Sequence, residues 1–391
     1  MDHRKGPRPT TDGDAAASTG DSLYGALRVH LDRGPVPFPP SLTGVDLRLL
    51  RSLFSPADAT IALELSALPE PVSTIARRLA RPDEVDDVRR DLEGMANRGI
   101  IHQTGPTGRE RYGKLPFAVG IYELQVDHLT ADLERDARQY FDEEFGQAFR
   151  SSPTRQMRTV PVGAAFRATS PVASTADVRA MILASPGPFA VLRCICRHGK
   201  DLLGEPCRTT TLRENCLTLG SGAETMMRRG AAHPVGREEM LALVERANTE
   251  GLVLQTQNAA APSFICCCCG CCCNVLTSAR RLPQPASRFA STHRAEVVAT
   301  ECSTCGTCTE RCPMQAIGVD TGGPVVDLDR CIGCGLCVTS CTSGAFRLAE
   351  REDASLPPAH SGALYTRLFR ERYGLIGTAV AIGRHLLGRK F

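Results

Sequence analysis

The first 193 residues of the chain contain no cysteine, and the remaining 198 contain all 19. The chain also lacks an apolar run of the roughly 20 residues that a membrane-spanning helix needs. Residues 1–20 are polar and have no apolar core, which argues against a secretory signal. The formal net charge is only +3, so overall charge gives no reason to expect a nucleic-acid partner. These absences predict a cytoplasmic protein.

In the cytoplasm, cellular thiols keep cysteines reduced, so disulfides are not expected. The odd number of cysteines also argues against a complete disulfide framework. The cysteine-rich half of the chain is therefore expected to bind metal.

Two copies of one cysteine pattern lie near the C-terminus. Each copy has three cysteines at intervals of three, followed by a fourth cysteine after three further residues, and Pro313 follows the first copy. In bacterial-type ferredoxins this spacing holds two [4Fe-4S] clusters, and the fourth cysteine of each run binds the other cluster. The predicted ligands are Cys302, Cys305, Cys308 and Cys341 for the first cluster, and Cys331, Cys334, Cys337 and Cys312 for the second.

A pair of zinc sites is the alternative for these eight cysteines. Zinc sites usually have two separated C-x2-C pairs, which fits the interleaved copies less well. One departure is Thr342, which stands where such proteins usually have proline; proline is not a ligand, so we expect binding to survive.

Eleven more cysteines lie between residues 194 and 273. Adjacent side chains of an extended strand point to opposite faces, so these thiols serve either one site on a curved loop or two sites on opposite faces. We favour at least one additional iron–sulfur cluster; small buried hydrophobes, zinc and a redox-active dithiol are the alternatives. The candidate ligands are Cys194, Cys196, Cys207, Cys216, Cys266, Cys268, Cys269, Cys271, Cys272 and Cys273.

Residues 189–216 and the cysteine run at 264–273 resemble a widespread bacterial and archaeal family of four-iron–four-sulfur binding proteins. The family has a helical front and a dicluster ferredoxin domain at its C-terminal end. The resemblance implies an electron-carrying iron–sulfur protein that serves a partner oxidoreductase. Cys267 departs from the family pattern, which has a polar residue there, and is therefore left out of the ligand set.

The front of the chain has a helical pattern. Ser55 and Pro56 supply a cap and a first helical position, Gly99 fits a C-terminal cap, and a strand and a glycine-rich turn follow. Helices are predicted at 46–54, 57–68, 71–80 and 83–98, an order typical of a winged helix. The would-be recognition helix, 83–98, carries six acidic residues against three arginines, which repels phosphate. A docking or dimerisation module is therefore favoured, and DNA binding is the alternative.

We thus predict an α+β protein with a winged-helix-like helical front, a mixed cysteine-rich middle domain and a C-terminal bacterial-type ferredoxin fold. The predicted segments are a disordered or linker stretch (1–40), the winged-helix-like helical domain (41–150), the cysteine-rich middle domain (151–290), the dicluster ferredoxin domain (291–350) and a basic amphipathic tail (351–391).

Three functions compete for this architecture. The favoured one is an electron-transfer protein that relays electrons to or from a partner oxidoreductase. The others are a redox-sensing winged-helix regulator and an oxidoreductase with a catalytic middle cluster. No catalytic residue is identified, and no nucleotide, flavin or phosphate loop is visible. The tail is expected either to contact a membrane surface or a partner, or to pack on the protein's own core, and self-association is a further expectation.

Overall fold

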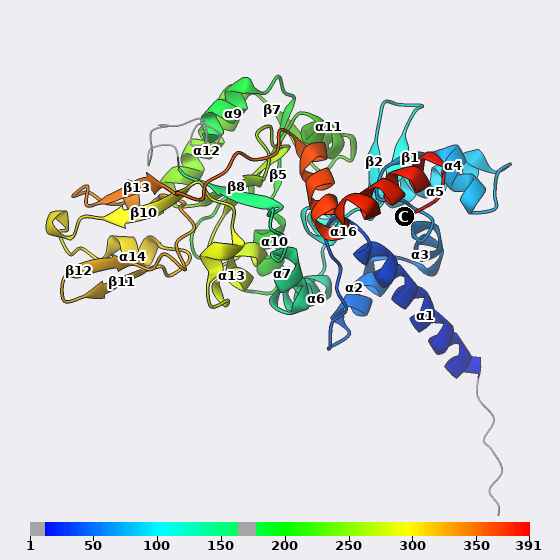
Figure 1. Cartoon of the computed structure of the whole chain (residues 1–391), viewed down its shortest axis with the longest axis horizontal. Coiled ribbons are helices and arrows are strands. Elements are labelled where there is room, and N and C mark those ends of the chain that lie inside the picture. Colours follow the sequence, from blue (N-terminus) through cyan, green and yellow to red (C-terminus); the bar gives the residue numbers. More distant parts are fainter. Residues whose placement is uncertain (1–11, 163–176) are drawn as a thin grey trace, which may run out of the picture.

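The computed structural model describes residues 12–162 and 177–391. Figure 1 shows a helical front at one end, a sheet in the middle and the C-terminal cysteine module at the other end. Two hydrophobic cores support this arrangement: one joins the front helices to parts of α10 and α16, and the other lies between the sheet and the C-terminal module.

The first helix corrects one prediction. Residues 1–40 were expected to be disordered or a linker, but α1 spans Asp12–Asp32. Tyr24, Leu27 and Leu31 recur at helical spacing and are buried, and the Tyr24 hydroxyl donates to the Phe54 carbonyl at 2.7 Å. The polar composition of the segment concealed this apolar stripe. Residues 1–11 lie outside the described part of the chain.

The predicted front helices are present, although the second is shorter than expected. Ser55 accepts from the Asp58 N–H at 3.1 Å, and Asp58 accepts from the Ser55 N–H at 3.0 Å, which forms a capping box. Gly99 has a positive φ of 76° at the predicted helix end. The elements are α2 (Val45–Leu53), α3 (Pro56–Ala62), β1 (Glu70–Pro71), α4 (Val72–Arg78), α5 (Val85–Asn97), β2 (His102–Thr104) and β3 (Arg111–Gly113), with sheet order β1-β3-β2.

A second group of helices connects the front helices to the sheet. In the stretch 122–150, the α-helices begin only at Ala131 and break at Glu143. Aromatic rings of this stretch pack together, with Phe145 stacked on Tyr140 at 4.9 Å between ring centroids. The elements are η1 (Phe117–Ile121), η2 (Glu123–Gln125), α6 (Ala131–Asp142) and α7 (Glu144–Phe149).

The middle of the chain forms a six-stranded antiparallel sheet in the order β4-β8-β9-β6-β5-β7. Figure 1 shows α9 and α12 on one side of it, and α10, α13 and α6 on the other. The strands are β4 (Met157–Val160), β5 (Phe189–Arg193), β6 (Glu214–Leu219), β7 (His233–Val235), β8 (Val253–Gln257) and β9 (Phe264–Cys268). The helices are α9 (Val178–Ala184), α10 (Ile195–Leu202), α11 (Ser221–Arg228), α12 (Arg237–Thr249), α13 (Asn274–Arg280) and the 3-10 turn η4 (Pro285–Arg288).

The C-terminal cysteine module has an internal duplication. Each half has a short helix that holds the third cysteine of its run, and the two helices pack together. β10 (His293–Val297) pairs with β13 (Phe346–Glu350), and β11 (Ile317–Asp320) pairs with β12 (Gly323–Val326). The helices are α14 (Thr307–Arg311) and α15 (Leu336–Thr339), with the 3-10 turn η5 (Ala299–Glu301) before them.

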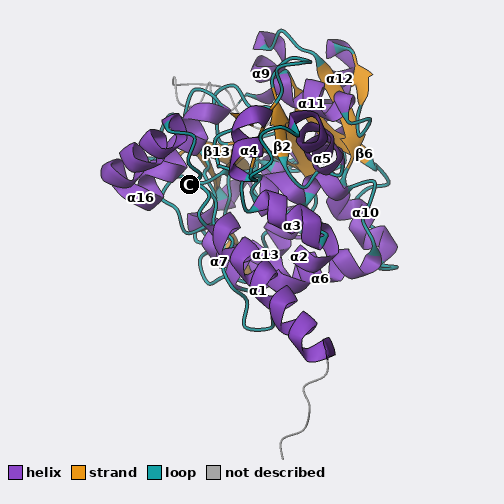
Figure 2. Cartoon of the chain, turned by 90° about the vertical axis from the view of Figure 1, so that its right-hand side faces the viewer, coloured by secondary structure: helices purple, strands orange, loops and turns teal. Residues whose placement is uncertain are grey.

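The tail forms α16 (Ser361–Leu386), which bends at Gly374. Its first half buries Leu364 and Leu368 in the front core, and the ring of Phe391 packs on Phe369. Figure 2 views the molecule from the front end and shows α16 along its side. The outer face of the second half exposes Leu375, Ile376, Val380, Ile382 and Leu386. In the described part of the chain, no helix is long and apolar enough to cross a membrane.

Candidate metal centres

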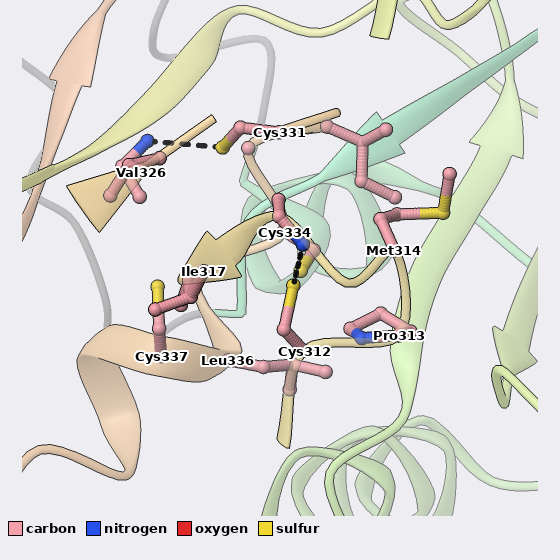
Figure 3. Close-up of a pocket in the computed structure, with 14 residues that line it drawn as sticks. Cys312, Pro313, Met314, Ile317, Val326, Cys331, Cys334, Leu336 and Cys337 are labelled. Carbon is pink, nitrogen blue, oxygen red and sulfur yellow. Dashed lines mark hydrogen bonds between the residues drawn. The ribbon is translucent and has the colours of Figure 1, made fainter. Parts of the chain in front are cut away.

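Four cysteine side chains line a cavity in the C-terminal module. Cys312 follows α14, whereas the other three come from the loop before α15 and from its first turn. Figure 3 shows all four among the residues that line this cavity. We call this the inner set: Cys312, Cys331, Cys334 and Cys337. It is the combination predicted for the second cluster, and its thiol donors and apolar walls fit a [4Fe-4S] cluster.

Backbone N–H groups point at two sulfurs of the inner set. The Ala295 N–H donates to Cys331 Sγ at 3.4 Å, and the Ala316 N–H donates to Cys312 Sγ at 3.2 Å. Such bonds stabilise an anionic cluster and tune its potential. Burial raises the pKa of Cys334 to about 12, so binding of a cluster must displace the proton of this thiol.

The outer set, predicted for the first cluster, lies nearer the surface. Cys305 is exposed, and the other three thiols are partly exposed. The Thr304 N–H donates to Cys302 Sγ at 3.3 Å, and the Ser343 hydroxyl lies 3.5 Å from Cys341 Sγ. The two sets therefore share a pattern but differ in access to solvent. The outer set is Cys302, Cys305, Cys308 and Cys341.

The eleven remaining cysteines fall into two groups and one separate thiol. Along β9, Cys266 and Cys268 share one face of the strand, whereas Cys267 lies on the other. Cys216 pairs with Cys266 across β6 and β9. Cys267 is buried in the core beside the sheet, where its carbonyl accepts from Arg197 at 2.7 Å.

The first group is a compact tetrathiolate. Its four sulfur atoms all lie within 4.8 Å of one another, and Cys207 Sγ lies 3.6 Å from both Cys269 Sγ and Cys271 Sγ. The hydrogen bond from Cys269 lowers the pKa of Cys207 to about 5, and the Thr209 and Thr210 N–H groups act in the same direction. The tetrathiolate group is Cys207, Cys269, Cys271 and Cys272.

The second group is a chain of neighbouring thiols, of which Cys268 and Cys273 are buried. Contacts run from Cys194 to Cys196, then to Cys273, Cys268, Cys266 and Cys216. The hydrogen bond to Cys196, together with burial, raises the pKa of Cys194. Among the described residues, no three sulfur atoms of this second group lie as close together as the sulfur atoms of the tetrathiolate group do. We call these six residues the interior group.

The charge of one buried arginine interacts with thiols of both groups. The Arg197 side chain is fully buried and donates to Asn215 Oδ1 at 2.5 Å as well as to the Cys267 carbonyl. Its charge interacts with Cys194 of the interior group and with Cys269 of the tetrathiolate group. A buried cation is costly unless it is compensated, so anionic metal–thiolate centres on both sides would stabilise it.

Three polar residues beside the two cysteine groups were not identified from the sequence alone. Arg138 on α6 donates to the carbonyls of Cys196 at 3.2 Å and Cys272 at 3.1 Å. It also pairs with the buried Glu134 at 2.5 Å, which accepts from the Tyr122 hydroxyl at 2.7 Å. Burial raises the pKa of Glu134. Glu134 stands among the apolar positions of the amphipathic helix α6, and this placement is the sequence signal that could have identified it.

The cysteine run touches the C-terminal module directly. Gly270 lies against Pro313, because a Cβ at Gly270 would stand 3.0 Å from the Pro313 Cβ. Arg280 joins the two by donating to the Gly270 carbonyl and to the Pro313 carbonyl, both at 3.3 Å. Pro313 follows Cys312 of the inner set. The turn that carries Cys269 and Cys271 therefore lies next to an inner-set ligand.

Comparisons with known proteins agree with this description of the C-terminal module. Residues 285–346 match the family model of the 4Fe-4S dicluster domain. An uncharacterized ferredoxin of Methanocaldococcus jannaschii is 46% identical over 44 residues, which cover 11% of this chain and 29% of that protein. An uncharacterized protein of Methanothermobacter thermautotrophicus is 49% identical over 49 residues, which cover 12% of this chain and 10% of that protein. The chain thus spans less than a third of either relative's length.

No solved structure matches the chain. The match to the dicluster family confirms that the chain is an iron–sulfur protein with a ferredoxin-type domain at its C-terminal end. The assignment of individual ligands, the middle sites and the segment boundaries stay predictions.

Proposed function

We propose that the chain is an electron-transfer protein that passes electrons between a partner oxidoreductase and a further iron–sulfur centre in its own middle domain. The contact between Gly270 and Pro313 carries this proposal, because it brings the turn that Cys268 and Cys273 flank next to an inner-set ligand. When bound, the clusters would supply one-electron transfer.

The two ferredoxin ligand sets differ in a way that suits a relay. Cys305 of the outer set is exposed, so a partner protein can approach this side. The inner set faces the middle domain, since the Val162 N–H donates to the Cys334 carbonyl at 3.0 Å. We therefore infer that the partner, an electron donor or acceptor protein, docks beside the outer set.

The interior group is the proposed ligand source for the further cluster. A cubane needs four thiolates that each reach a different iron, so its ligands stand farther apart than the ligands of a single ion. Six neighbouring thiols in an extended chain offer such a set. The backbones of Arg197 and Asn274 act on the pKa values of Cys194 and Cys196 in the direction that favours thiolates, as expected around an anionic cluster.

Iron and sulfide counting on the anaerobically purified full chain tests this proposal. Three [4Fe-4S] clusters correspond to about 12 irons and two clusters to about eight. We expect about 12 irons in the wild type and about eight in Cys268→Ala, with the ferredoxin signals in electron paramagnetic resonance unchanged. Cys267→Ala, at the neighbouring position on the other face of β9, is the matched control and should keep about 12. A wild-type count near eight that Cys268→Ala leaves unchanged would refute the middle cluster.

We further infer that the front module is a winged helix, because its helices precede a hairpin and its sheet order is β1-β3-β2. Its proposed role is docking or self-association. Arginines of α5 and of the loop before it are paired with acidic residues. Arg81 contacts Glu84 at 2.7 Å and Asp91 at 3.0 Å, and Arg90 contacts Asp87. These pairs leave little positive charge for phosphates. A gel-shift assay at physiological salt should show no DNA binding in either redox state; a shifted complex would favour the regulator instead.

A further inference from the structure

The geometry points to a second, chemically different metal site in the middle domain. We propose that Cys207, Cys269, Cys271 and Cys272 bind a single tetrahedral ion, either zinc or one iron, and that they do not hold an iron–sulfur cubane. This site goes beyond the proposed relay, which uses the interior group, and its presence does not depend on electron flow.

The sulfur spacing distinguishes a single ion from a cluster. A zinc–thiolate bond is about 2.3 Å long, so four thiolates at the corners of a tetrahedron stand about 3.8 Å apart. In this group Cys271 Sγ lies 3.6 Å from Cys269 Sγ and 3.6 Å from Cys272 Sγ, and Cys207 Sγ lies 3.6 Å from two of them. All four sulfurs fall within 4.8 Å of one another. A cubane places a different iron under each thiolate, which this spacing does not accommodate.

The surroundings also favour thiolates. The Thr209 hydroxyl lies 3.4 Å from Cys271 Sγ. Arg138 donates to the carbonyl of Cys272, and the buried Arg197 interacts with Cys207 and Cys269. Four thiolates and one divalent ion carry a net charge of −2, so these donors and cations offset the charge of the bound site.

The ion would join two segments that are far apart in sequence. Cys207 lies in the loop between α10 and β6, whereas the other three ligands lie in the turn between β9 and α13. That turn includes Gly270, which packs on Pro313 of the ferredoxin-type domain. Four soft thiolates in tetrahedral geometry select zinc or iron among the common metals. We infer that the ion fixes the shape of the turn on which that domain docks.

Elemental analysis and X-ray absorption on the anaerobically purified full chain test the proposal. We expect one zinc or one sulfide-free iron per chain, with four sulfur neighbours at about 2.3 Å and no metal neighbour. Cys271→Ala and Cys207→Ala, from different loops, should each lose this one ion and keep the acid-labile sulfide content of the wild type. Cys267→Ala is the matched control, since it removes a nearby buried thiol from outside the group, and it should keep the ion.

The metal found distinguishes the two forms of the site: absorption at the zinc edge identifies zinc, and a sulfide-free iron signal identifies iron. Loss of about four irons and four sulfides together in Cys271→Ala would overturn the proposal, because it would mean that these thiols hold a cubane. Wild-type protein without such an ion, or with disulfides among the four thiols, would overturn it as well. These outcomes are independent of the iron count in Cys268→Ala, so each proposal can fail alone.

Discussion

Replacing Gly333 with alanine should disrupt the inner set selectively. Gly333 lies between Cys331 and Cys334 and has a φ of +66°, where a non-glycine residue costs roughly 1–2 kcal/mol. A Cβ there would also overlap the His293 carbonyl oxygen and stand 2.5 Å from Ser291 Oγ. Overpacking of this kind typically costs a further 1–3 kcal/mol, so the total is about 2–5 kcal/mol. A free-energy difference of 1.4 kcal/mol changes an equilibrium constant by a factor of ten, so the affinity of the inner set for its cluster should fall at least roughly 30-fold.

The chain contains its own controls for this reasoning. Gly306 has a φ of +77° but no atom within 4 Å of its added Cβ, so Gly306→Ala should show only the backbone cost of roughly 1–2 kcal/mol. Thr304 occupies the equivalent position of the outer loop at a φ of +57°, which shows that an exposed loop accepts a side chain there. Iron transfer to a chelator under anaerobic conditions measures the retention of the clusters. Equal effects of Gly333→Ala and Gly306→Ala would refute the overlap argument.

Three further changes have defined outcomes. Arg280→Met removes the link between Gly270 and Pro313 and should slow reduction of the middle centre in stopped-flow experiments, while the total iron content stays constant. Burial raises the pKa of Glu123 to about 7 from 4.5. Between these pH values the unfolded chain binds fewer protons than the folded chain does, so the free energy of unfolding should fall by up to about 3 kcal/mol as the pH rises from 4.5 to 7. Glu123→Gln should flatten that decline in anaerobic thermal unfolding curves. Arg197→Met removes a buried cation, so a redox titration should show a more negative potential for the middle centre.

Local patterns in the sequence were enough to predict the ferredoxin-type domain and most of the front helices. The fixed cysteine intervals specify a ligand loop directly, and Ser55 with Pro56 specifies a helix start. The helix α1 was missed, because its apolar stripe lies in a segment whose composition is polar. The strand order of the middle sheet could not be predicted, since it depends on pairings between strands that are far apart in the chain.

The division of the eleven middle cysteines depends on tertiary structure in the same way. Strand alternation alone separates Cys267 from Cys266 and Cys268. It cannot reveal that Cys207, more than 60 residues earlier, joins Cys269. That meeting depends on how the loop after α10 lies over the turn after β9, which is a matter of packing.

The buried charges give a reason why two centres should lie side by side. Arg197 is fully buried and interacts with thiols of both groups, and Arg138 donates to one carbonyl from each group. Glu134 offsets the charge of Arg138, but Arg197 has a neutral amide and a carbonyl as its hydrogen-bond partners. An uncompensated buried cation is strongly destabilising, so the packing around Arg197 favours a state in which the neighbouring thiols are ionised and bound to metal. Metal binding in the middle domain should therefore be coupled to its folding.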